Sequence, residues 1–351
     1  NLTGTGGETL ISGITVQEES STVGTAGSIT ILDFQGASVT AAASGSNKAV
    51  ITVAGAASTD AWIADSQENL VAGNAAGASR DADTCFNIML GYQAGNALNS
   101  GDDNVFLGKY AGTNATSGCY NLAFGKYSLG QGVVTGSNNV ALGCQAAQKL
   151  TTGNHNSFIG SNVAGNAAVT GSHNHMFGKG AATCLTSGSC NFIGGYSAGY
   201  CITTAHDNIL LGRSIASAGA AAMTGGSNVV LGKDAGKCIT SGGCNVFLGT
   251  VATGAVVTGS WNIAMGEWAM NALAGGFNNI AMGQAAAKTL ATGTGNVILG
   301  VAAACKLTSG DYNIAIGCFT CLPNDNGSNQ MALGCGVCSW IRGNANWNVG
   351  I

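Results

Sequence analysis

The stretch NVALGCQAAQKLTTGNHNSFIG, residues 139–160, contains two copies of one short pattern. Each copy is an asparagine, three mostly apolar residues and a glycine. The copies begin at Asn139 and Asn156, 17 residues apart. A period this short cannot be a folded domain, and it is typical of units that stack on one another.

The pattern recurs over most of the chain, in 17 copies whose first residues lie 16 to 20 positions apart. It starts at Asn69 and ends with two degenerate copies, QMALG from Gln330 and NWNVG from Asn346. The 20-residue step contains Ala218–Ala222, which we expect to bulge out as a loop. The regular anchors are Asn87, Asn104, Asn121, Asn139, Asn156, Asn174, Asn191, Asn208, Asn228, Asn245, Asn262, Asn279, Asn296 and Asn313.

Each anchor is expected to begin a short strand. A small residue follows seven positions after the asparagine, as at Ala111, and then a turn such as Thr116-Ser117-Gly118. Glycine and asparagine tolerate left-handed backbone conformations, so they suit the corners of a coil. One 17-residue unit cannot bury its own apolar face, whereas stacked units can. We therefore predict an all-β fold, a parallel β-solenoid of about 17 rungs over residues 64–351.

Both faces of each predicted strand are apolar. Val105 and Leu107 share one face, and Phe106 lies on the other. A strand that is apolar on both faces is usually buried on both. One face can line the interior of the coil, so the other needs a cover, which a parallel trimer about the fibre axis would supply. The alternative is a flattened coil with an exposed apolar face.

Residues 1–63 do not show the repeat. Residues 13–17, 27–34 and 48–54 read as strands separated by Gly, Ser and Asn. We expect a small β module for attachment, capping or strand exchange with a neighbouring subunit.

Composition excludes several classes of function. Charged residues make up 8% of the chain, hydrophobic residues 46%, and the net charge is −4. A disordered chain is usually charged and poor in apolar residues. Nucleic-acid binding needs a basic patch, which is missing here. No run of 18 apolar residues predicts a membrane span. The chain begins at Asn1, so either a leader has been removed or the numbering starts inside a longer protein.

The 13 cysteines favour an oxidising, extracellular setting. Cys184 and Cys190, and likewise Cys238 and Cys244, bracket a turn, so each pair is a candidate local disulfide. Cys318 and Cys321 lie one repeat before Cys335 and Cys338. This spacing predicts the rung-to-rung disulfides Cys318–Cys335 and Cys321–Cys338, with a zinc site or free thiols as alternatives.

Other candidate sites are weaker. His173 and His175 could form a metal pair, but a structural role is favoured and no cofactor or metal is expected. The Asp residues precede the anchors and suit turns better than acid–base chemistry, so no catalytic residue is predicted and the chain is not expected to be an enzyme. Candidate glycosylation sites are Asn1, Asn114 and Asn326.

Exposed columns allow two further interpretations. The residue five after the anchor is basic in several rungs (Lys109, Lys126, Lys179, Arg213 and Lys233). This column is either a solvated face or a contact for glycans or anionic surfaces. A file of Thr before each anchor allows ice binding as a third, weaker hypothesis.

The residues from Asn139 to Gly165 resemble the head repeats of trimeric autotransporter adhesins and the Asn/Gly repeats of phage and algal-virus tail fibres. Val16–Glu19, Val23–Thr25, Leu32–Phe34 and Val39–Ala41 also resemble a small module of phage tail proteins. These resemblances imply parallel β-rolls or β-helices, usually trimeric, in adhesive or spacer shafts.

We therefore expect a structural subunit of an extracellular fibre, located outside the cell or on a virion surface. The alternatives are a filament that polymerises head to tail and a carbohydrate-binding adhesive module. The expected partner is the chain itself, as a homotrimer or a head-to-tail polymer, with surface glycans as a second possibility.

Overall fold

The structure is a computed structural model that describes residues 38–43, 49–54, 63–217, 222–336, 338–344, 346 and 349–350. The chain divides into two compact units, Asn1–Ala61 and Trp62–Ile351. The predicted strands at 13–17 and 27–34 lie outside the described residues. In the first unit, β1 (Ser38–Ala43) pairs antiparallel with β2 (Ala49–Ala54), which confirms the predicted strand at 48–54.

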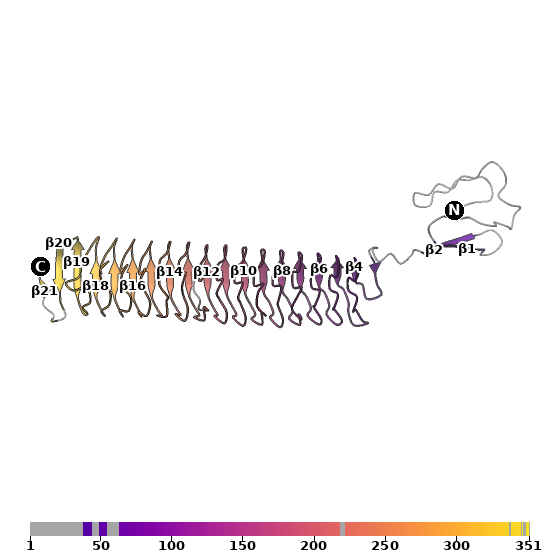
Figure 1. Ribbon diagram of the computed structural model, residues 1–351, viewed down its shortest axis with the longest axis horizontal. Helices are drawn as coiled ribbons and strands as arrows, with labels where there is room; N and C mark the ends of the chain where they lie inside the picture. The colour runs from indigo at the N-terminus through magenta and orange to yellow at the C-terminus, as the bar shows by residue number, and fades with distance from the viewer. Residues whose placement is uncertain are drawn as a thin grey trace, which may run out of the picture. The chain divides into compact units, whose positions relative to one another are not determined.

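The second unit is the predicted parallel β-solenoid (Figure 1). No helix occurs among the described residues. β3 (Ile63–Ala64) pairs antiparallel with β4, and a continuous series of parallel pairs then joins β4 to β19. The strands are β4 (Leu70–Ala72), β5 (Ile88–Leu90), β6 (Val105–Leu107), β7 (Leu122–Phe124), β8 (Val140–Leu142), β9 (Ser157–Ile159), β10 (His175–Phe177), β11 (Phe192–Gly194), β12 (Ile209–Leu211), β13 (Val229–Leu231), β14 (Val246–Leu248), β15 (Ile263–Met265), β16 (Ile280–Met282), β17 (Val297–Leu299), β18 (Ile314–Ile316), β19 (Met331–Cys335), β20 (Cys338–Gly343) and β21 (Val349–Gly350).

The register is constant, so each residue stacks on the residue at the same repeat position. Val105 pairs with Ile88 on one side and with Leu122 on the other. The predicted bulge at Ala218–Ala222 falls mostly on residues 218–221, outside the described part. The rungs that flank it keep their register, because Ile209 pairs with Val229. An insertion at this corner therefore leaves the ladder undisturbed.

The last repeat copy departs from the prediction. Gln330 directly precedes β19, which is a parallel rung as expected. NWNVG from Asn346, however, is not a parallel rung. β20 turns back and pairs antiparallel with β19, and β21 pairs antiparallel with β20. The expectation of a 17th stacked copy is wrong for this reason, and the parallel ladder ends at β19.

The core is a set of side-chain columns inside the coil. The middle residue of each strand points inward: Phe106, Phe158 and Phe247 are fully buried. The small residue seven after the anchor is also buried, as at Ala111 and Ala235. On a second wall, isolated parallel bridges such as Leu150 to Val169 add pairing points. The sequence left open which strand face lines the interior, and the structure shows that it is the middle residue.

The glycine that ends each strand is required by both conformation and space. Gly143 has φ +132°, and a Cβ there would lie 2.4 Å from the Gly160 carbonyl oxygen of the next rung. At other corners, the left-handed backbone conformation is adopted by residues other than glycine. Large residues such as Tyr120 and Trp261, directly before the anchors, also have left-handed backbones, with φ of 58°. The expectation that Gly and Asn fill the corners therefore holds only in part.

We predict that Gly143→Ala destabilises the solenoid by about 2 kcal/mol or more, because it combines a strained φ with a backbone clash. Gly180→Ala is the matched control. Its φ of +67° is shared by non-glycine residues in other rungs, and its nearest atoms are 3.6 Å from the added Cβ. Hydrogen exchange of the flanking rungs would measure both effects, and equal protection in the two variants would contradict this account.

Candidate functional site

The anchor asparagines form one unbroken ladder inside the coil. Their side chains are buried from Asn69 to Asn313. At each step the backbone N–H and the side-chain Nδ2 of one asparagine both donate to the Oδ1 of the asparagine before it. For Asn245 these two distances to Asn228 Oδ1 are 3.0 and 3.1 Å. The anchor asparagine therefore joins neighbouring rungs by side-chain hydrogen bonds, in addition to its place at a corner of the coil.

Every polar group of a ladder asparagine is satisfied. The second Nδ2 hydrogen of Asn245 is donated to the Gly259 carbonyl at 3.0 Å, while its Oδ1 accepts from the N–H and Nδ2 of Asn262. Two donors and two acceptor sites exhaust what an amide side chain offers. Buried polar groups are costly only when they lack partners, so this column stabilises an interior that would otherwise be apolar.

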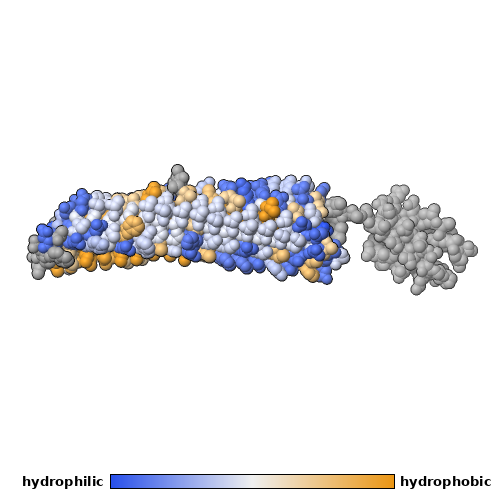
Figure 2. Space-filling view, turned by 90° about the horizontal axis from the view of Figure 1, so that it is seen from below, coloured by the Kyte–Doolittle hydropathy of each residue, from blue (hydrophilic) through white to orange (hydrophobic). Residues whose placement is uncertain are grey.

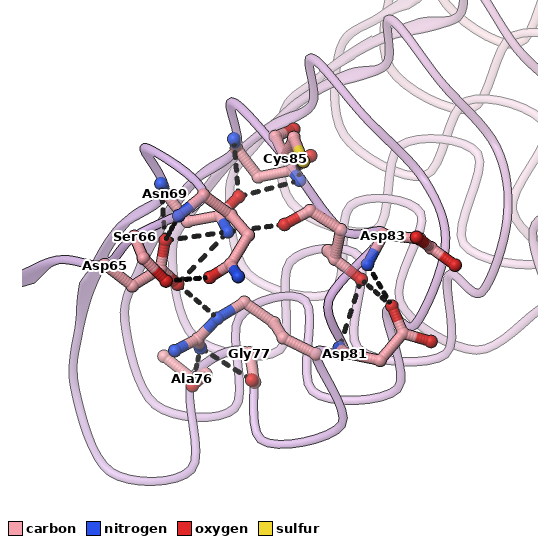
Figure 3. A network of polar contacts seen from close by, with 12 residues as sticks. Asp65, Ser66, Asn69, Ala76, Gly77, Asp81, Asp83 and Cys85 are labelled. Carbon is pink, nitrogen blue, oxygen red and sulfur yellow. Dashed lines mark hydrogen bonds and ion pairs between the residues drawn. The ribbon is translucent and has the colours of Figure 1, made fainter.

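The N-terminal end of the ladder is closed by Asp65 (Figure 3). Its Oδ1 accepts from the Asn69 N–H at 2.9 Å and from the Asn69 Nδ2 at 3.1 Å. These are the two contacts that each later asparagine gives to its predecessor. Asp65 thus takes the place of a preceding asparagine. Its Oδ2 is bound by the Arg80 Nε at 3.1 Å.

The charge state of Asp65 follows from these partners. Burial alone would raise the pKa of its carboxyl. The hydrogen bonds from Asn69 and Gln67 and the charge of Arg80 outweigh burial and lower that pKa below its ordinary value. The carboxylate form is therefore favoured at the end of the ladder.

The C-terminal end is closed by Gln330. Its N–H donates to Asn313 Oδ1 at 2.9 Å and so completes the ladder. Its longer side chain then folds back within its own rung, where Oε1 accepts from the Asn324 N–H at 2.7 Å and Nε2 donates to the Asn324 carbonyl at 2.8 Å. The amide is used locally, so the ladder stops here.

A second polar ladder, which the sequence analysis missed, runs two residues before the anchors. The Cys85 N–H donates to Asp102 Oδ1 at 2.7 Å, and the Asn154 N–H donates to Ser172 Oγ at 2.9 Å. The signal was present as a short polar residue at this position in many rungs. Asp102 and Asp311 both belong to this second ladder and therefore have a structural role. Asp311 Oδ1 accepts from the Thr294 N–H, as Asp102 Oδ1 does from the Cys85 N–H.

The outward face of the ladder strands is apolar, and we name it the outward wall. It consists of the residues one and three after each anchor, in β4 to β19. Phe124 is 58% exposed, and Phe192, Ile209, Met282 and Ile316 are about 40% exposed. His175 is the one titratable residue on it. Figure 2 shows a hydrophobic border along the C-terminal part of the solenoid, while hydrophilic residues gather toward its N-terminal end.

An aromatic and cationic cluster lies over three neighbouring rungs. Tyr110 and Tyr127 stack with ring centroids 4.7 Å apart, and Tyr92 meets Tyr110 edge-on at 5.3 Å. Lys109 lies over Tyr92 and Tyr110, and Lys126 over Tyr127. These tyrosines are 18 and 17 positions apart in the sequence, and the stacking of the rungs brings them together.

No disulfide joins cysteines within the described residues. Burial, and then the neighbouring Cys335 thiol, raise the pKa of Cys318, and the Gly336 N–H donates to the Cys318 carbonyl at 2.8 Å. The disulfide between Cys318 and Cys335 stays a prediction. The backbone of Cys338 lies opposite Cys335 on the returning strand β20, and the pairing of Cys338 with Cys321 stays a prediction. For Cys201, burial first and then the thiols of Cys184 and Cys238 raise the pKa. The pairs Cys184–Cys190 and Cys238–Cys244 stay predictions.

The remaining candidate residues lie on the surface. His173 and His175 are exposed, and His173 stacks on His155 at 5.0 Å. Among the described residues, no group of three or more His, Cys, Asp or Glu could hold a metal ion. Asn114 and Asn326 are exposed, and Asn1 lies outside the described residues. The five basic residues of the column five after the anchor are also exposed.

Comparison with protein-family models, with curated proteins and with solved structures finds no match to this chain. In the part of the chain that the structure describes, no helix has the length and hydropathy needed to cross a bilayer.

We predict that Asn245→Ala destabilises the neighbouring rungs by about 2 to 5 kcal/mol, because it leaves the Asn262 N–H and the Gly259 carbonyl without this partner and removes one of the two donors to Asn228 Oδ1. Asn99→Ala, at an exposed asparagine outside the ladder, should change stability by less than about 0.5 kcal/mol. Denaturant unfolding measures both, and a similar small effect at the two positions would show that the ladder contributes little.

The cap at Asp65 predicts a pH dependence confined to the first rungs. A lowered folded-state pKa stabilises above the unfolded value of about 3.9, and this stabilisation is lost as the pH falls through the folded pKa. The protection of the amides at residues 69–73, measured relative to their intrinsic exchange rate at each pH, should therefore fall below about pH 4. Asp65→Asn keeps an oxygen for Asn69 and should remove this acid step, whereas Asp65→Ala should expose these amides at every pH. An unchanged acid step in Asp65→Asn would assign it to another group.

Proposed function

We propose that this chain is a structural subunit of an extracellular fibre and that its solenoid forms the shaft. The observation that carries the proposal is the unbroken, fully hydrogen-bonded asparagine ladder through all the parallel rungs. Each rung is fixed to the next by backbone pairs, side-chain amides and stacked core residues. A series of such rungs resists bending and has a length set by the number of repeats.

The expected length follows from the strand spacing. The parallel ladder from β4 to β19 has a fixed spacing of about 4.8 Å per strand, which gives a rod of about 72 Å. Low charge and high glycine content suit a shaft, because the corners need glycine and the surface needs no substrate-binding groups. The extracellular or virion-surface location is part of the proposal and rests on the cysteine content and on the resemblance to fibre repeats.

The proposal includes no catalytic role. The acidic residues near the anchors are engaged in turn hydrogen bonds, as at Asp102 and Asp311. Shallow depressions lie beside Pro323 and Asn324 and beside Tyr200 and Lys237. The second is lined by Ser197, Ser214 and Ser217, and the Ser217 hydroxyl donates to the Ser214 carbonyl at 2.8 Å. These observations support a structural role over an enzymatic one.

A head-to-tail filament is the second candidate within the structural class. Its coil would have to continue from one subunit into the next. Asp65 and Gln330 use their side chains at the two ends of the ladder, and β20 covers the edge of β19 with an antiparallel strand. Covered edges disfavour strand addition, which supports rods of defined length, and end-to-end joining would then depend on residues 1–61.

A carbohydrate-binding role has one observation in its favour, the cluster of Tyr92, Tyr110 and Tyr127. Sugars stack on free aromatic faces, but here the rings of Tyr110 and Tyr127 cover each other and lysines lie over the rings. We therefore rank glycan binding below the shaft.

Negative-stain microscopy of the full chain, combined with mass measurement over a range of concentrations, tests the proposal. We expect straight rods with a stacked part of about 72 Å and no growth in length with concentration. Long filaments would favour head-to-tail polymerisation, and compact particles without a rod would overturn the shaft. A variant that lacks residues 1–61 separates the two structural candidates, because it should keep the rods and lose any filaments.

A further inference from the structure

We propose that the outward wall is the contact surface for a second copy of this chain, which lies parallel and in register with the first. The inference deepens the proposed shaft function and rests on it. It concerns how shafts associate side by side, whereas the proposal above concerns the rod formed by one chain.

The size and chemistry of the wall indicate a protein partner. The wall is about 72 Å long and about 10 Å wide, so it offers roughly 700 Å² from each copy. Two such surfaces would bury about 1,400 Å², within the range of stable interfaces of about 1,200 to 2,000 Å². Exposed apolar patches larger than a few hundred Å² mark interaction sites. The wall carries no carboxylate, Lys or Arg along its length.

Two rims flank the wall. The leading rim is the residue directly before each anchor, and the trailing rim is the residue five after it. In two rungs, residues of opposite charge occupy the two rims. In the rung of β6 they are Asp103 and Lys109, and in the rung of β12 they are Asp207 and Arg213. All four side chains are exposed.

Symmetry decides which rims meet. When two parallel rods face each other about an axis along the rods, their strands run in opposite directions. The leading rim of each copy then faces the trailing rim of the other, at the same height. Asp103 would lie opposite Lys109 of the second copy, and Asp207 opposite Arg213. This arrangement brings opposite charges together at both rungs.

An antiparallel arrangement of the two rods brings like charges together instead. Each rim then faces its own kind, and with full overlap the rung of β10 lies opposite the rung of β13. Lys179 would then face Lys233 of the second copy, and like charges at an interface disfavour association. The charge pattern therefore selects the parallel orientation.

Aromatic residues meet favourable partners in the same way at two rungs. The rung of β7 carries Tyr120 and Lys126, which would form a cation–π contact between copies. The rung of β5 carries Phe86 and Tyr92, which would form an aromatic pair. Phe86 is 55% and Tyr120 60% exposed in the single chain, and exposed aromatics are enriched at interfaces. The rungs of β10 and β15 are exceptions, since they place His173 opposite Lys179 and Trp261 opposite Glu267.

Charge-swap variants of the full chain test the orientation. Asp103→Lys with Asp207→Lys makes both rims basic, and Lys109→Asp with Arg213→Asp makes both acidic. Each pair of changes should weaken association by about tenfold at low salt, and less at about 1 M salt, where charges are screened. The fourfold variant exchanges the rims without changing the net charge. It should associate like the original chain, which sedimentation equilibrium measures.

A variant of the wall tests the surface itself. Ile209→Lys places a charge in its centre and should abolish association, whereas Val133→Lys, at an exposed apolar residue outside the wall, should not. Rods at monomer mass for the original chain would overturn this inference and leave the shaft standing. An oligomer that is insensitive to the rim changes, or fails to recover in the fourfold variant, would overturn the parallel orientation. Failure to form rods at all would instead overturn the shaft.

Discussion

The structure depends on one interaction, the amide ladder formed by the anchor asparagines. A narrow coil of 17 residues has little room for a core, and many of its inward residues are as small as alanine. The ladder compensates by placing repeated, buried hydrogen bonds inside the rungs from Asn69 to Asn313. Each amide from Asn69 to Asn296 accepts twice and donates twice, so burial leaves none of their groups unpaired. Hydrogen bonds in a chain polarise one another, so the column gains from its length.

The ladder also explains why the backbone can adopt costly conformations. The residue before each anchor has a left-handed φ even when it is Phe86, Tyr120 or Trp261. A left-handed conformation costs an ordinary residue roughly 1 to 2 kcal/mol. The coil tolerates it because that turn brings the asparagine inward onto its neighbour. Side chains at this corner point outward, so the interior of the coil does not restrict which residue type occupies this position.

Much of the fold could be predicted from the sequence, because one period governs it. The anchors, the strands and their parallel stacking all follow from the spacing of Asn87, Asn104 and their successors. The two ends could not be predicted in the same way. Asp65 lies outside the motif and acts through one carboxylate oxygen that imitates an amide oxygen. Asn346 fits the motif but follows Gln330, whose extra methylene turns the amide away from the next rung. Periodicity describes the middle of a solenoid, whereas its ends depend on single side chains. The grouping of Tyr92 with Tyr110 also needed the structure, since the two occupy different repeat positions.

The direction of the ladder gives the rod an electrical polarity. Every side-chain amide donates one hydrogen to the asparagine on its N-terminal side and accepts from the asparagine on its C-terminal side, as Asn245 does between Asn228 and Asn262. The aligned amide dipoles therefore add along the axis, as peptide dipoles do in a helix. The positive end lies at Asn69, where the carboxylate of Asp65 sits, and Glu68, Asp81 and Asp83 follow nearby in the sequence. The two ends of the ladder therefore differ in the sign of their electrostatic potential. A carboxylate at the first rung interacts favourably with the positive end of the aligned amide dipoles.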